Sequence, residues 1–307
     1  MTALRLVFAG SPEAAVPSLR AVLASDHEVA GVLTRQDSPQ GRKRALTPTP
    51  VAAAAAATGV PVWKSNRLAP VAEAITDARP DLGVIVAYGG LVREPLLSAP
   101  RLGWINLHFS LLPRWRGAAP VQHAILAGDE LTGATVFQLV EELDAGDVYG
   151  RLTAPIGPRE TAGELLGKLA TSGAELLVRV IDNLATGEAR PEPQAGDVTL
   201  APKLALADGR IDWTEPAPRV RNRVRAMTPE PGAHTEVDGA RFKIHAVAPA
   251  DSAAPLAPGR IAAADGRVLA GTGSAPVELV TVQPAGKTPM PASDWWRGTH
   301  TQEVVAR

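Results

Sequence analysis

The sequence contains no cysteine, and that absence removes several kinds of chemistry at once. Without thiols, the chain can form no disulfide bond, no thiolate zinc or iron–sulfur site and no cysteine nucleophile. Its 6 histidines are scattered, and none belongs to an HExxH motif or another closely spaced pair of metal ligands. We therefore expect no metal at the functional site.

Long hydrophobic runs are also missing. The longest apolar run, Leu82–Val92, is about half of the roughly 20 residues that a membrane helix needs, and a Tyr-Gly-Gly stretch at 88–90 interrupts it. The N-terminal residues reach a proline and an acidic residue too soon for a secretory signal. We expect a cytoplasmic protein that does not associate with membranes.

Neither sign of charge dominates, since 31 basic residues face 32 acidic ones and the formal net charge is −1 at pH 7. The protein as a whole therefore does not attract nucleic acid, although local clusters of basic residues can still do so. Hydrophobic residues make up 45% of the chain, enough for a sizeable core. A length of 307 residues is typical of one large domain or two ordinary ones.

Strand and helix patterns alternate along the first part of the chain. The apolar run Leu4–Phe8 leads through a Gly-Ser-Pro-Glu turn into a helical pattern that reaches about Leu23. We expect Ser11 at the helix cap and Pro12 at the first helical position. Strands that alternate with helices predict an α/β fold, with a Rossmann-like, open and mostly parallel sheet joined by right-handed crossovers. Further strands are predicted at 28–34, 82–87, 103–108 and 134–139, and a further helix at 51–58.

The composition changes near residue 188. Residues 188–197 are polar and rich in proline, as in a linker. Beyond Asp208, short β-like runs recur between turn residues, as in a small β-barrel of the OB type. We therefore predict an α/β domain at 1–187, a linker at 188–207 and a β-barrel domain at 208–307. The β-like runs are 241–247, 259–263, 268–270 and 277–282, with a helix expected at 219–225.

Two polar residues lie at the end of the predicted strand 103–108. Asn106 and His108 are two residues apart, so their side chains point to the same face, at the strand end where α/β sheets bind ligands. An amide that donates to a developing oxyanion, beside an imidazole that moves protons near neutral pH, suits acyl-type transfer. On its own, such a pair is more often structural than catalytic.

The residues that follow carry a specific resemblance. The run from Asn106 to Pro120 reads NLHFSLLPRWRGAAP, and the run from Leu143 to Asp147 reads LDAGD. Both resemble the 10-formyltetrahydrofolate-dependent formyltransferases, whose catalytic strand reads Asn-x-His-x-Ser-Leu-Leu-Pro and whose second motif is Leu-Asp-x-Gly-Asp. The first run is most similar to the members of that family that act on methionyl-tRNA, and the resemblance extends across nearly the whole chain. One departure is Phe109, where many relatives carry a small residue.

The resemblance implies transfer of the formyl group of 10-formyltetrahydrofolate to the amino group of methionine on initiator tRNA, with neither a metal nor a nicotinamide. It implies that Asn106 donates a hydrogen bond to the tetrahedral oxyanion. It also implies that Asp144 orients His108, keeps it protonated, and accepts the proton that the amine loses, directly or through water. By the same resemblance, the folate pocket is lined by Val86, Tyr88, Gly89, Ser110, Leu111, Leu112 and Pro113.

A basic, Gly/Pro-rich segment follows the second predicted strand, at residues 34–50. Taken alone, its Arg-Lys-Arg run is typical of a solvated surface. By resemblance, this loop inserts into the acceptor end of the tRNA, with Arg42 as the main contact. Lys43 and Arg44 accompany it as further tRNA-binding candidates.

A second basic cluster lies in the predicted helix 219–225, where four arginines occupy alternate positions. Because residues four apart share a helix face, Arg219 and Arg223 lie together and can meet phosphates. The resemblance assigns tRNA binding to this C-terminal domain. We expect the protein to be a monomer.

The residues alone leave other functions open. Transferases that formylate glycinamide ribonucleotide or an amino sugar share the Asn-x-His and Asp pattern, but would need neither the basic loop nor the long β-rich domain. Hydrolysis of 10-formyltetrahydrofolate would use water in place of the amine. A catalytically silent RNA-binding module is less consistent with the presence of all three polar residues. An NAD(P)-dependent dehydrogenase is disfavoured, because the turn at residues 10–13 holds only the first glycine of GxGxxG.

Overall fold

The structure, a computed structural model, describes residues 3–41, 43–299 and 303–307. The chain forms two compact units that alternate along the sequence. Within the described residues, no helix is both long enough and apolar enough to span a lipid bilayer. The N-terminal unit consists of Met1–Pro120, Leu131–Pro155 and Leu166–Ala201, and the C-terminal unit of Val121–Glu130, Ile156–Leu165 and Pro202–Arg307.

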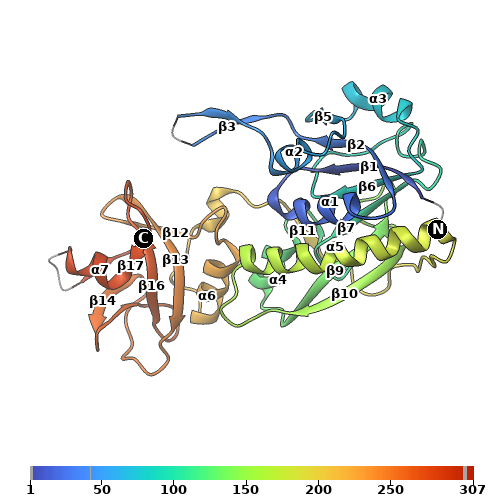
Figure 1. Ribbon diagram of the computed structural model, residues 1–307. Coiled ribbons are helices and arrows are strands. Elements are labelled where there is room, and N and C mark those ends of the chain that lie inside the picture. The colour runs from blue at the N-terminus through green and yellow to red at the C-terminus, as the bar shows by residue number, and fades with distance from the viewer. Residues whose placement is uncertain (1–2, 42, 300–302) are drawn as a thin grey trace. The chain divides into compact units, whose positions relative to one another are not determined.

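A seven-stranded sheet forms the centre of the N-terminal unit, with its strands in the order β10-β9-β7-β6-β1-β2-β5 (Figure 1). The five strands from β7 to β5 in this order are parallel, whereas β9 is antiparallel to β7 and β10 to β9. The prediction of an α/β fold with a mostly parallel sheet is therefore confirmed. The strands are β1 Arg5–Gly10, β2 Glu28–Thr34, β5 Val62–Lys64, β6 Leu82–Val86, β7 Trp104–His108, β9 Leu131–Gln138 and β10 Val148–Pro155.

The first helix begins differently from the prediction. Pro12, not Ser11, stands at the cap, and the first turn is a 3₁₀ helix at Glu13–Ala15. The Ser11 hydroxyl instead accepts a hydrogen bond from the N–H of Arg35, just after β2, at 3.2 Å. The serine thus ties the turn after β1 to the neighbouring strand, a long-range contact that the local capping pattern does not reveal. The helices up to residue 187 are α1 Val16–Leu23, α2 Pro50–Ala55, α3 Ala72–Asp77, α4 Pro120–Ala127 and α5 Ala162–Thr186, with a second 3₁₀ turn at Ala69–Val71.

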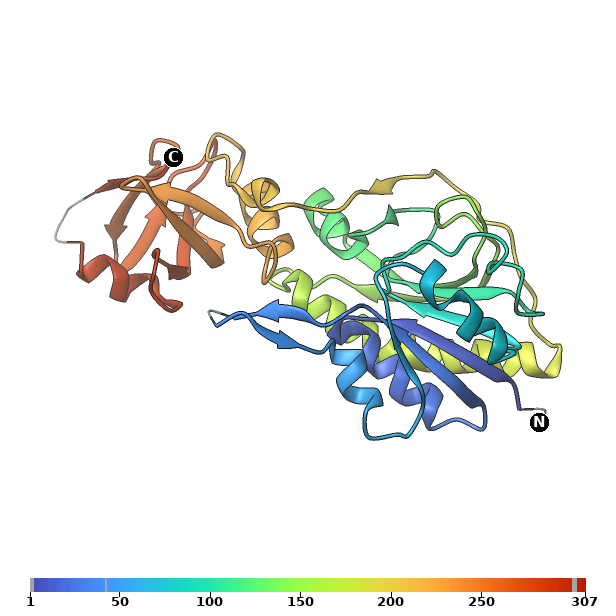
Figure 2. The same cartoon turned by 90° about the horizontal axis from the view of Figure 1, so that it is seen from above.

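The long helix α5 runs along one face of the sheet (Figure 2). Its Gly173 lies against the side chain of Leu107 on β7, and its Leu176 lies against Gly150 on β10. Side chains alternate along a strand. Asn106 and His108, which flank Leu107, therefore point to the opposite face of the sheet. The packing of α5 therefore decides on which side of the sheet the two polar residues lie.

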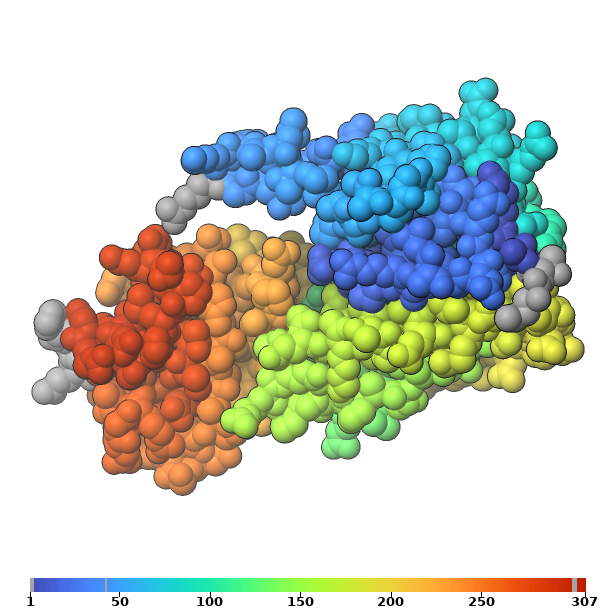
Figure 3. All heavy atoms as spheres, in the orientation of Figure 1, coloured from blue at the N-terminus to red at the C-terminus, as the bar shows by residue number. Residues whose placement is uncertain are grey.

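Residues 38–47, inside the predicted basic loop, form a two-stranded hairpin of β3 (Ser38–Gln40) and β4 (Ala45–Thr47). The space-filling view shows this hairpin standing out from the body of its unit (Figure 3). Its strands are mostly exposed, and Leu46 is 73% exposed although it is apolar. Sequence patterns did not predict these strands, because their alternation is too short to register.

The C-terminal unit is built around antiparallel strands in the order β12-β13-β16-β15-β14-β18. An antiparallel bridge from Val237 to Ala306, with paired hydrogen bonds between Glu236 and Arg307 of 2.9 and 3.0 Å, joins the two ends of that order. The predicted β-rich domain is therefore confirmed, and its strands close into a small barrel. The elements are η3 Leu206–Gly209, α6 Ala217–Ala226, β12 His234–Val237, β13 Ala240–Pro249, β14 Arg260–Ala264, β15 Arg267–Ala270, β16 Val277–Gln283, β17 Met290–Pro291, α7 Ala292–Arg297 and β18 Val304–Val305.

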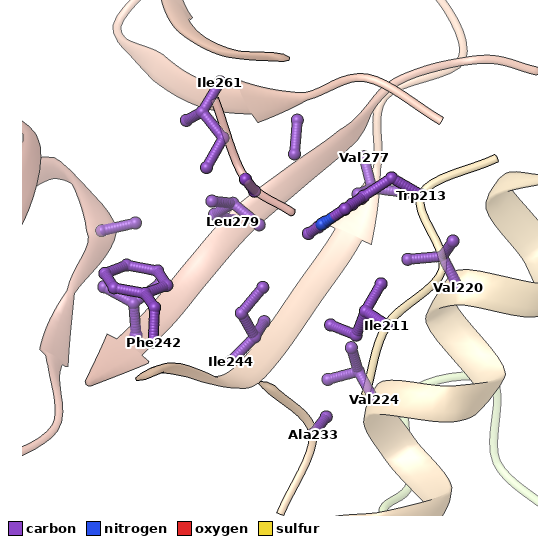
Figure 4. Close-up of a cluster of buried hydrophobic side chains, with 14 of the residues drawn as sticks. Ile211, Trp213, Val220, Val224, Ala233, Phe242, Ile244, Ile261, Val277 and Leu279 are labelled. Atoms are coloured by element: carbon purple, nitrogen blue, oxygen red, sulfur yellow. The ribbon is translucent and has the colours of Figure 1, made fainter. Parts of the chain in front are cut away.

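Side chains of the barrel and of α6 form one hydrophobic core (Figure 4). Trp213 is 4% exposed, and its indole N–H donates to the Thr235 hydroxyl at 3.1 Å, so its one polar atom is satisfied inside the core. Val220 and Val224 of α6 are four residues apart and pack into this core together. The helical pattern predicted at 219–225 thus describes a helix that seals the barrel interior.

Strand β16 offers a matched test of this packing. Val282 is fully buried, whereas Val280, two residues earlier, is 41% exposed. We expect Val282→Ala to lower the free energy of unfolding of the C-terminal unit by about 1–3 kcal/mol, because it loses two buried methyl groups and leaves a cavity. Val280→Ala should stay within about 0.5 kcal/mol of wild type. Urea unfolding followed by intrinsic tryptophan fluorescence, to which the buried Trp213 contributes, measures both, and equal losses would contradict the assigned register.

Candidate active site

The end of β7 presents two of the predicted catalytic residues on one face of the sheet. Asn106 is in register with Phe137 of β9, and His108 with Thr135. Asn106 is partly exposed, and its side chain forms no hydrogen bond within the described ranges. Its amide hydrogens are therefore available to an oxygen of a bound substrate.

His108 is held tightly, with 7% of its surface exposed. Its Nε2 lies 2.8 Å from the carbonyl oxygen of Trp115, and because a carbonyl only accepts, Nε2 carries the hydrogen. The Phe137 ring packs edge-on against the imidazole, with centroids 6.5 Å apart. These contacts leave Nδ1 as the nitrogen that can exchange a proton with a ligand.

Nδ1 of His108 faces Asp144, the third predicted catalytic residue. The distance from Nδ1 to Asp144 Oδ2 is 3.8 Å, within reach of an electrostatic attraction but longer than a hydrogen bond. Oδ2 also accepts a hydrogen bond from the N–H of Gly117 at 2.8 Å, and Asp144 is 8% exposed. The structure thus brings the three predicted catalytic residues together from two motifs that lie about 35 residues apart.

Glycine is required at one position in each motif. Gly117 has a φ of +124°, and a Cβ there would lie 2.6 Å from the carbonyl oxygen of Ala201. At Gly146 a Cβ would collide with the carbonyl oxygen of Gln138 on β9. Both glycines allow close backbone approach beside Asp144, which explains why the motifs contain them.

The segment after His108 was predicted to line the folate pocket, and its side chains are largely inside the protein. Ser110 and Leu112 are buried, and Leu111 is half-buried. The Ser110 hydroxyl donates to the carbonyl of Arg114 at 2.6 Å, while the Thr135 hydroxyl donates to the carbonyl of Ser110 at 2.7 Å. Pro113 is buried as well. These contacts hold the segment in place, and Leu111 is its one side chain from 110 to 113 that is not buried.

The end of β6 lies beside the end of β7, since Ile85 is in register with Asn106. Of the residues predicted there, Val86 is fully buried, and Tyr88 is 1% exposed with its hydroxyl donating to the carbonyl of Ser65 at 2.7 Å. Burial raises the pKa of the Tyr88 phenol, and the nearby charge of Arg35 opposes that shift. Ala87 and Gly89 are exposed at this strand end, and the carbonyl of Gly89 accepts a hydrogen bond from Nη2 of Arg35 at 2.9 Å.

Two residues that the sequence did not single out also lie beside Asp144. The side-chain amide of Gln194 donates to the carbonyl of Asp144 at 2.7 Å, and Arg116 in turn donates to Gln194. Arg116 lies within the first motif, but only the structure shows that it is buried and donates to Gln194. The polar, proline-rich surroundings of Gln194 predicted a linker, and no local signal marks this residue.

Comparison with known proteins connects this geometry to a family. Residues 4–181 match the family described as formyl transferase, and residues 203–300 match the formyl transferase C-terminal domain. The methionyl-tRNA formyltransferase of Clavibacter sepedonicus is 60% identical over 99% of this chain and 100% of its own length, and that of Leifsonia xyli is 61% identical over the same shares. The chain belongs to the methionyl-tRNA formyltransferase family.

Solved structures share the formyltransferase fold at lower identity. HypX from Aquifex aeolicus, in complex with tetrahydrofolic acid, matches 96% of this chain and 47% of its own with a TM-score of 0.66 and 19% identity. The N-formyltransferase from Helicobacter canadensis matches 92% of this chain and 99% of its own with a TM-score of 0.69 and 16% identity. At these identities, the likeness concerns the fold alone.

The predicted tRNA-binding residues of this formyltransferase differ in solvent exposure and in the contacts that their side chains already make. Arg42 lies outside the described residues, while Lys43 and Arg44 are exposed in the turn of the β3–β4 hairpin. Arg219 is exposed at the start of α6. Arg223, on the same helix face, donates to the carbonyl of Asp208 at 2.9 Å and lies 3.4 Å from Glu215. Position on a helix face therefore did not by itself identify the available arginine.

The glycine of the second motif in this formyltransferase can be tested against a glycine with free space. We expect Gly146→Ala to lower the free energy of unfolding by about 1–3 kcal/mol, because the new Cβ displaces the backbone of β9. Gly167, exposed on α5, has no atom near the position of a Cβ, so Gly167→Ala should stabilise the helix by up to about 1 kcal/mol. Thermal unfolding should shift in opposite directions, and shifts of the same sign would refute the steric argument.

Proposed function

We propose that this chain transfers the formyl group of 10-formyltetrahydrofolate to the amino group of methionine on initiator methionyl-tRNA, for translation initiation. The observation that carries the proposal is the full-length similarity, near 60% identity, to relatives named methionyl-tRNA formyltransferase. The arrangement of Asn106, His108 and Asp144 at the strand ends supports it, because these groups suit attack of an amine on a formyl carbon. A relative in fold that binds tetrahydrofolic acid supports the choice of donor.

The reaction forms one bond and breaks another. The methionine nitrogen attacks the formyl carbon, and the carbonyl oxygen becomes an oxyanion in the tetrahedral intermediate. The bond from that carbon to N10 of the folate then breaks, N10 gains a proton and the amine loses one. We assign the oxyanion to the amide hydrogens of Asn106, whose side chain is free to donate.

We assign proton transfer to His108 and Asp144. Nε2 of His108 is bound to a backbone carbonyl, so Nδ1 is the atom that acts on the substrate. Asp144 Oδ2 faces Nδ1 and is bound to the Gly117 N–H, which leaves Oδ1 to accept the proton of the amine, directly or through water. The negative carboxylate attracts the imidazolium that forms when His108 takes up a proton.

Folate binding is assigned to the two strand ends beside these residues. The first group follows β7 and comprises Ser110–Pro113, whose backbone is held by Thr135. The second follows β6 and comprises Val86, Tyr88 and Gly89. Because most of these side chains are buried, we expect the backbone and Leu111 to make the contacts.

Binding of tRNA is assigned to Arg42, Lys43 and Arg44 of the basic segment 34–50 and to Arg219 and Arg223 in α6. Lys43, Arg44 and Arg219 are exposed in the structure, as phosphate contacts require. Arg223 would have to exchange its contact with Glu215 for a phosphate. The functional division that we propose is a catalytic domain at 1–187, a linker at 188–207 and a tRNA-binding barrel at 208–307. We further propose a monomer that acts in the cytoplasm, where initiator tRNA is charged.

One experiment decides between this function and its rivals. The purified protein receives 10-formyltetrahydrofolate with a labelled formyl group, together with methionyl-tRNA, glycinamide ribonucleotide, an amino sugar nucleotide or buffer alone. We expect label on methionyl-tRNA only. Label on another acceptor, or release of formate in every reaction, would replace the proposed function by the corresponding rival.

The catalytic assignment predicts a severe kinetic defect without loss of folding. Asn106→Ala should lower turnover by roughly 10²–10³-fold, the usual effect of removing one oxyanion donor. His108→Ala and Asp144→Asn should be at least as slow, because proton transfer fails. Asp77→Asn, an exposed aspartate on α3, is the matched control and should turn over like wild type. A folded Asp144→Asn protein with normal turnover would remove Asp144 from the mechanism.

The basic hairpin predicts a difference between charge and oriented contact. Arg42→Lys keeps the charge but loses the planar guanidinium, so it should lower kcat/KM for initiator methionyl-tRNA by roughly 5–150-fold, equivalent to about 1–3 kcal/mol. Lys43→Ala should weaken binding by an amount that shrinks as salt rises. The comparison uses initiator and elongator methionyl-tRNA at low and moderate salt. Small, equal losses on both tRNAs that vanish with salt would mean that the hairpin supplies charge alone.

A further inference from the structure

The segment predicted as a linker lies against the catalytic residues. From Pro191 to Leu200, every side chain is exposed except those of Gln194 and Thr199, which are half-buried. Glu192 exchanges two backbone hydrogen bonds with Val148 of β10, at 2.7 and 2.9 Å. At the other end, β11 (Leu200–Ala201) pairs in parallel with β8 (Arg116–Gly117). The segment is therefore anchored at both ends to the N-terminal unit.

Gln194 holds the backbone of the Asp144 loop. Its Nε2 donates two hydrogen bonds, to the carbonyl of Asp144 at 2.7 Å and to that of Gly146 at 2.9 Å. Its Oε1 accepts from Nη2 of Arg116 at 2.8 Å and from Nε of the same residue at 3.3 Å. Both hydrogens and both lone pairs of the amide are thus used, and the partners fix which atom is oxygen and which is nitrogen.

Arg116 completes this support from the opposite side. It is 9% exposed, and its remaining contact is Glu142, 3.2 Å away and itself largely exposed. A buried guanidinium needs such partners, because an unpaired charge in the interior is costly. Gln194 therefore joins the charge of Arg116 to the loop that carries Asp144.

Thr199 holds the backbone of the segment that contacts His108 and Asp144, at Trp115 and Arg116. Its hydroxyl accepts the N–H of Trp115 at 2.8 Å, and its carbonyl accepts the N–H of Arg116 at 2.9 Å. The stretch Trp115–Gly117 that Thr199 holds in this way supplies Nε2 of His108 with the Trp115 carbonyl and Oδ2 of Asp144 with the Gly117 N–H. Segment 192–201 thus anchors both backbone groups that orient His108 and Asp144, namely the Trp115 carbonyl and the Gly117 N–H.

We propose that Gln194 is a positioning residue for the transfer reaction, which sets Asp144 against His108 through the carbonyls of Asp144 and Gly146. This inference rests on the proposed function. Asp144 has a φ of +48°, in the left-handed region, which aspartate tolerates better than most residues but which its surroundings still have to stabilise. The two donors of Gln194 supply that constraint, and without them the loop relaxes and the carboxylate moves away from the substrate.

The test compares Gln194→Glu and Gln194→Ala with Glu192→Ala. Gln194→Glu keeps the contact with Arg116 but replaces the donating nitrogen by an oxygen that faces two carbonyls. We expect both Gln194 variants to lower kcat about 10–100-fold, as a displacement of about 1 Å in a catalytic group does, with KM for folate and methionyl-tRNA unchanged within about threefold. Glu192→Ala removes only an exposed side chain and keeps the backbone hydrogen bonds to Val148. Its kcat and KM should therefore equal those of the wild type.

A double-mutant cycle shows whether Gln194 acts through Asp144. The double variant Asp144→Asn, Gln194→Ala should have the same kcat as Asp144→Asn alone. Gln194→Ala displaces the side chain at position 144, which Asp144→Asn has already made inactive in proton transfer. Hydrogen exchange gives a readout independent of turnover: the amide of Gly117, bound to Asp144 Oδ2, should exchange faster in Gln194→Ala and not in Glu192→Ala.

The outcomes separate the two proposals. Wild-type protein that transfers no formyl group to methionyl-tRNA overturns the proposed function, whatever Gln194 does. Active wild-type protein with additive losses in the cycle, with a loss in KM alone, or with unchanged exchange at Gly117 overturns the positioning role of Gln194 and leaves the proposed function standing.

Discussion

The hydrogen bond from the Gly117 N–H to Asp144 Oδ2, 2.8 Å long, is the contact on which the geometry of the site depends. It joins β8, in the segment that follows β7, to the loop after β9. His108 contacts both segments, through the Trp115 carbonyl at Nε2 and the Asp144 carboxylate near Nδ1. Together these contacts close a small ring, in which displacement of one member moves the others. The sheet supplies the rigid base of the ring, because His108 is the last residue of β7.

Three members of that ring have positive φ angles: Trp115 at +61°, Gly117 at +124° and Asp144 at +48°. For a residue other than glycine, such a conformation costs on the order of 1–3 kcal/mol. The ring therefore does not form from local preference, and its neighbours have to hold it. Gly146 allows β9 to approach, and the segment 192–201 binds the ring from outside. The strained backbone of the site is therefore held by segment 192–201 of the same unit.

Much of the fold follows from short patterns in the chain. The strand at 82–87 was predictable because a buried parallel strand is a continuous apolar run, and it is observed as β6. The short strand predicted at 103–108 is observed as β7. The alternation of strand side chains was enough to place Asn106 and His108 on one face. The barrel strands β13 to β16 and the helix α6 were predicted within about two residues from short patterns, whereas β12, β17 and β18 were not predicted. The cap at Ser11 was wrong, because a tertiary contact with Arg35 won over local capping.

The sequence by itself determined the α/β order, the β-rich second half and the two motifs that carry Asn106, His108 and Asp144. Only the tertiary structure decided that Nε2 of His108 is bound to a backbone carbonyl and that Arg223 is tethered while Arg219 is exposed. It also decided that Gln194, in a stretch with the composition of a linker, supports the catalytic loop. The physical reason is range: periodicity and capping act over a few residues, whereas the Gln194 amide binds a carbonyl 50 positions away, which only the folded chain brings within 2.7 Å.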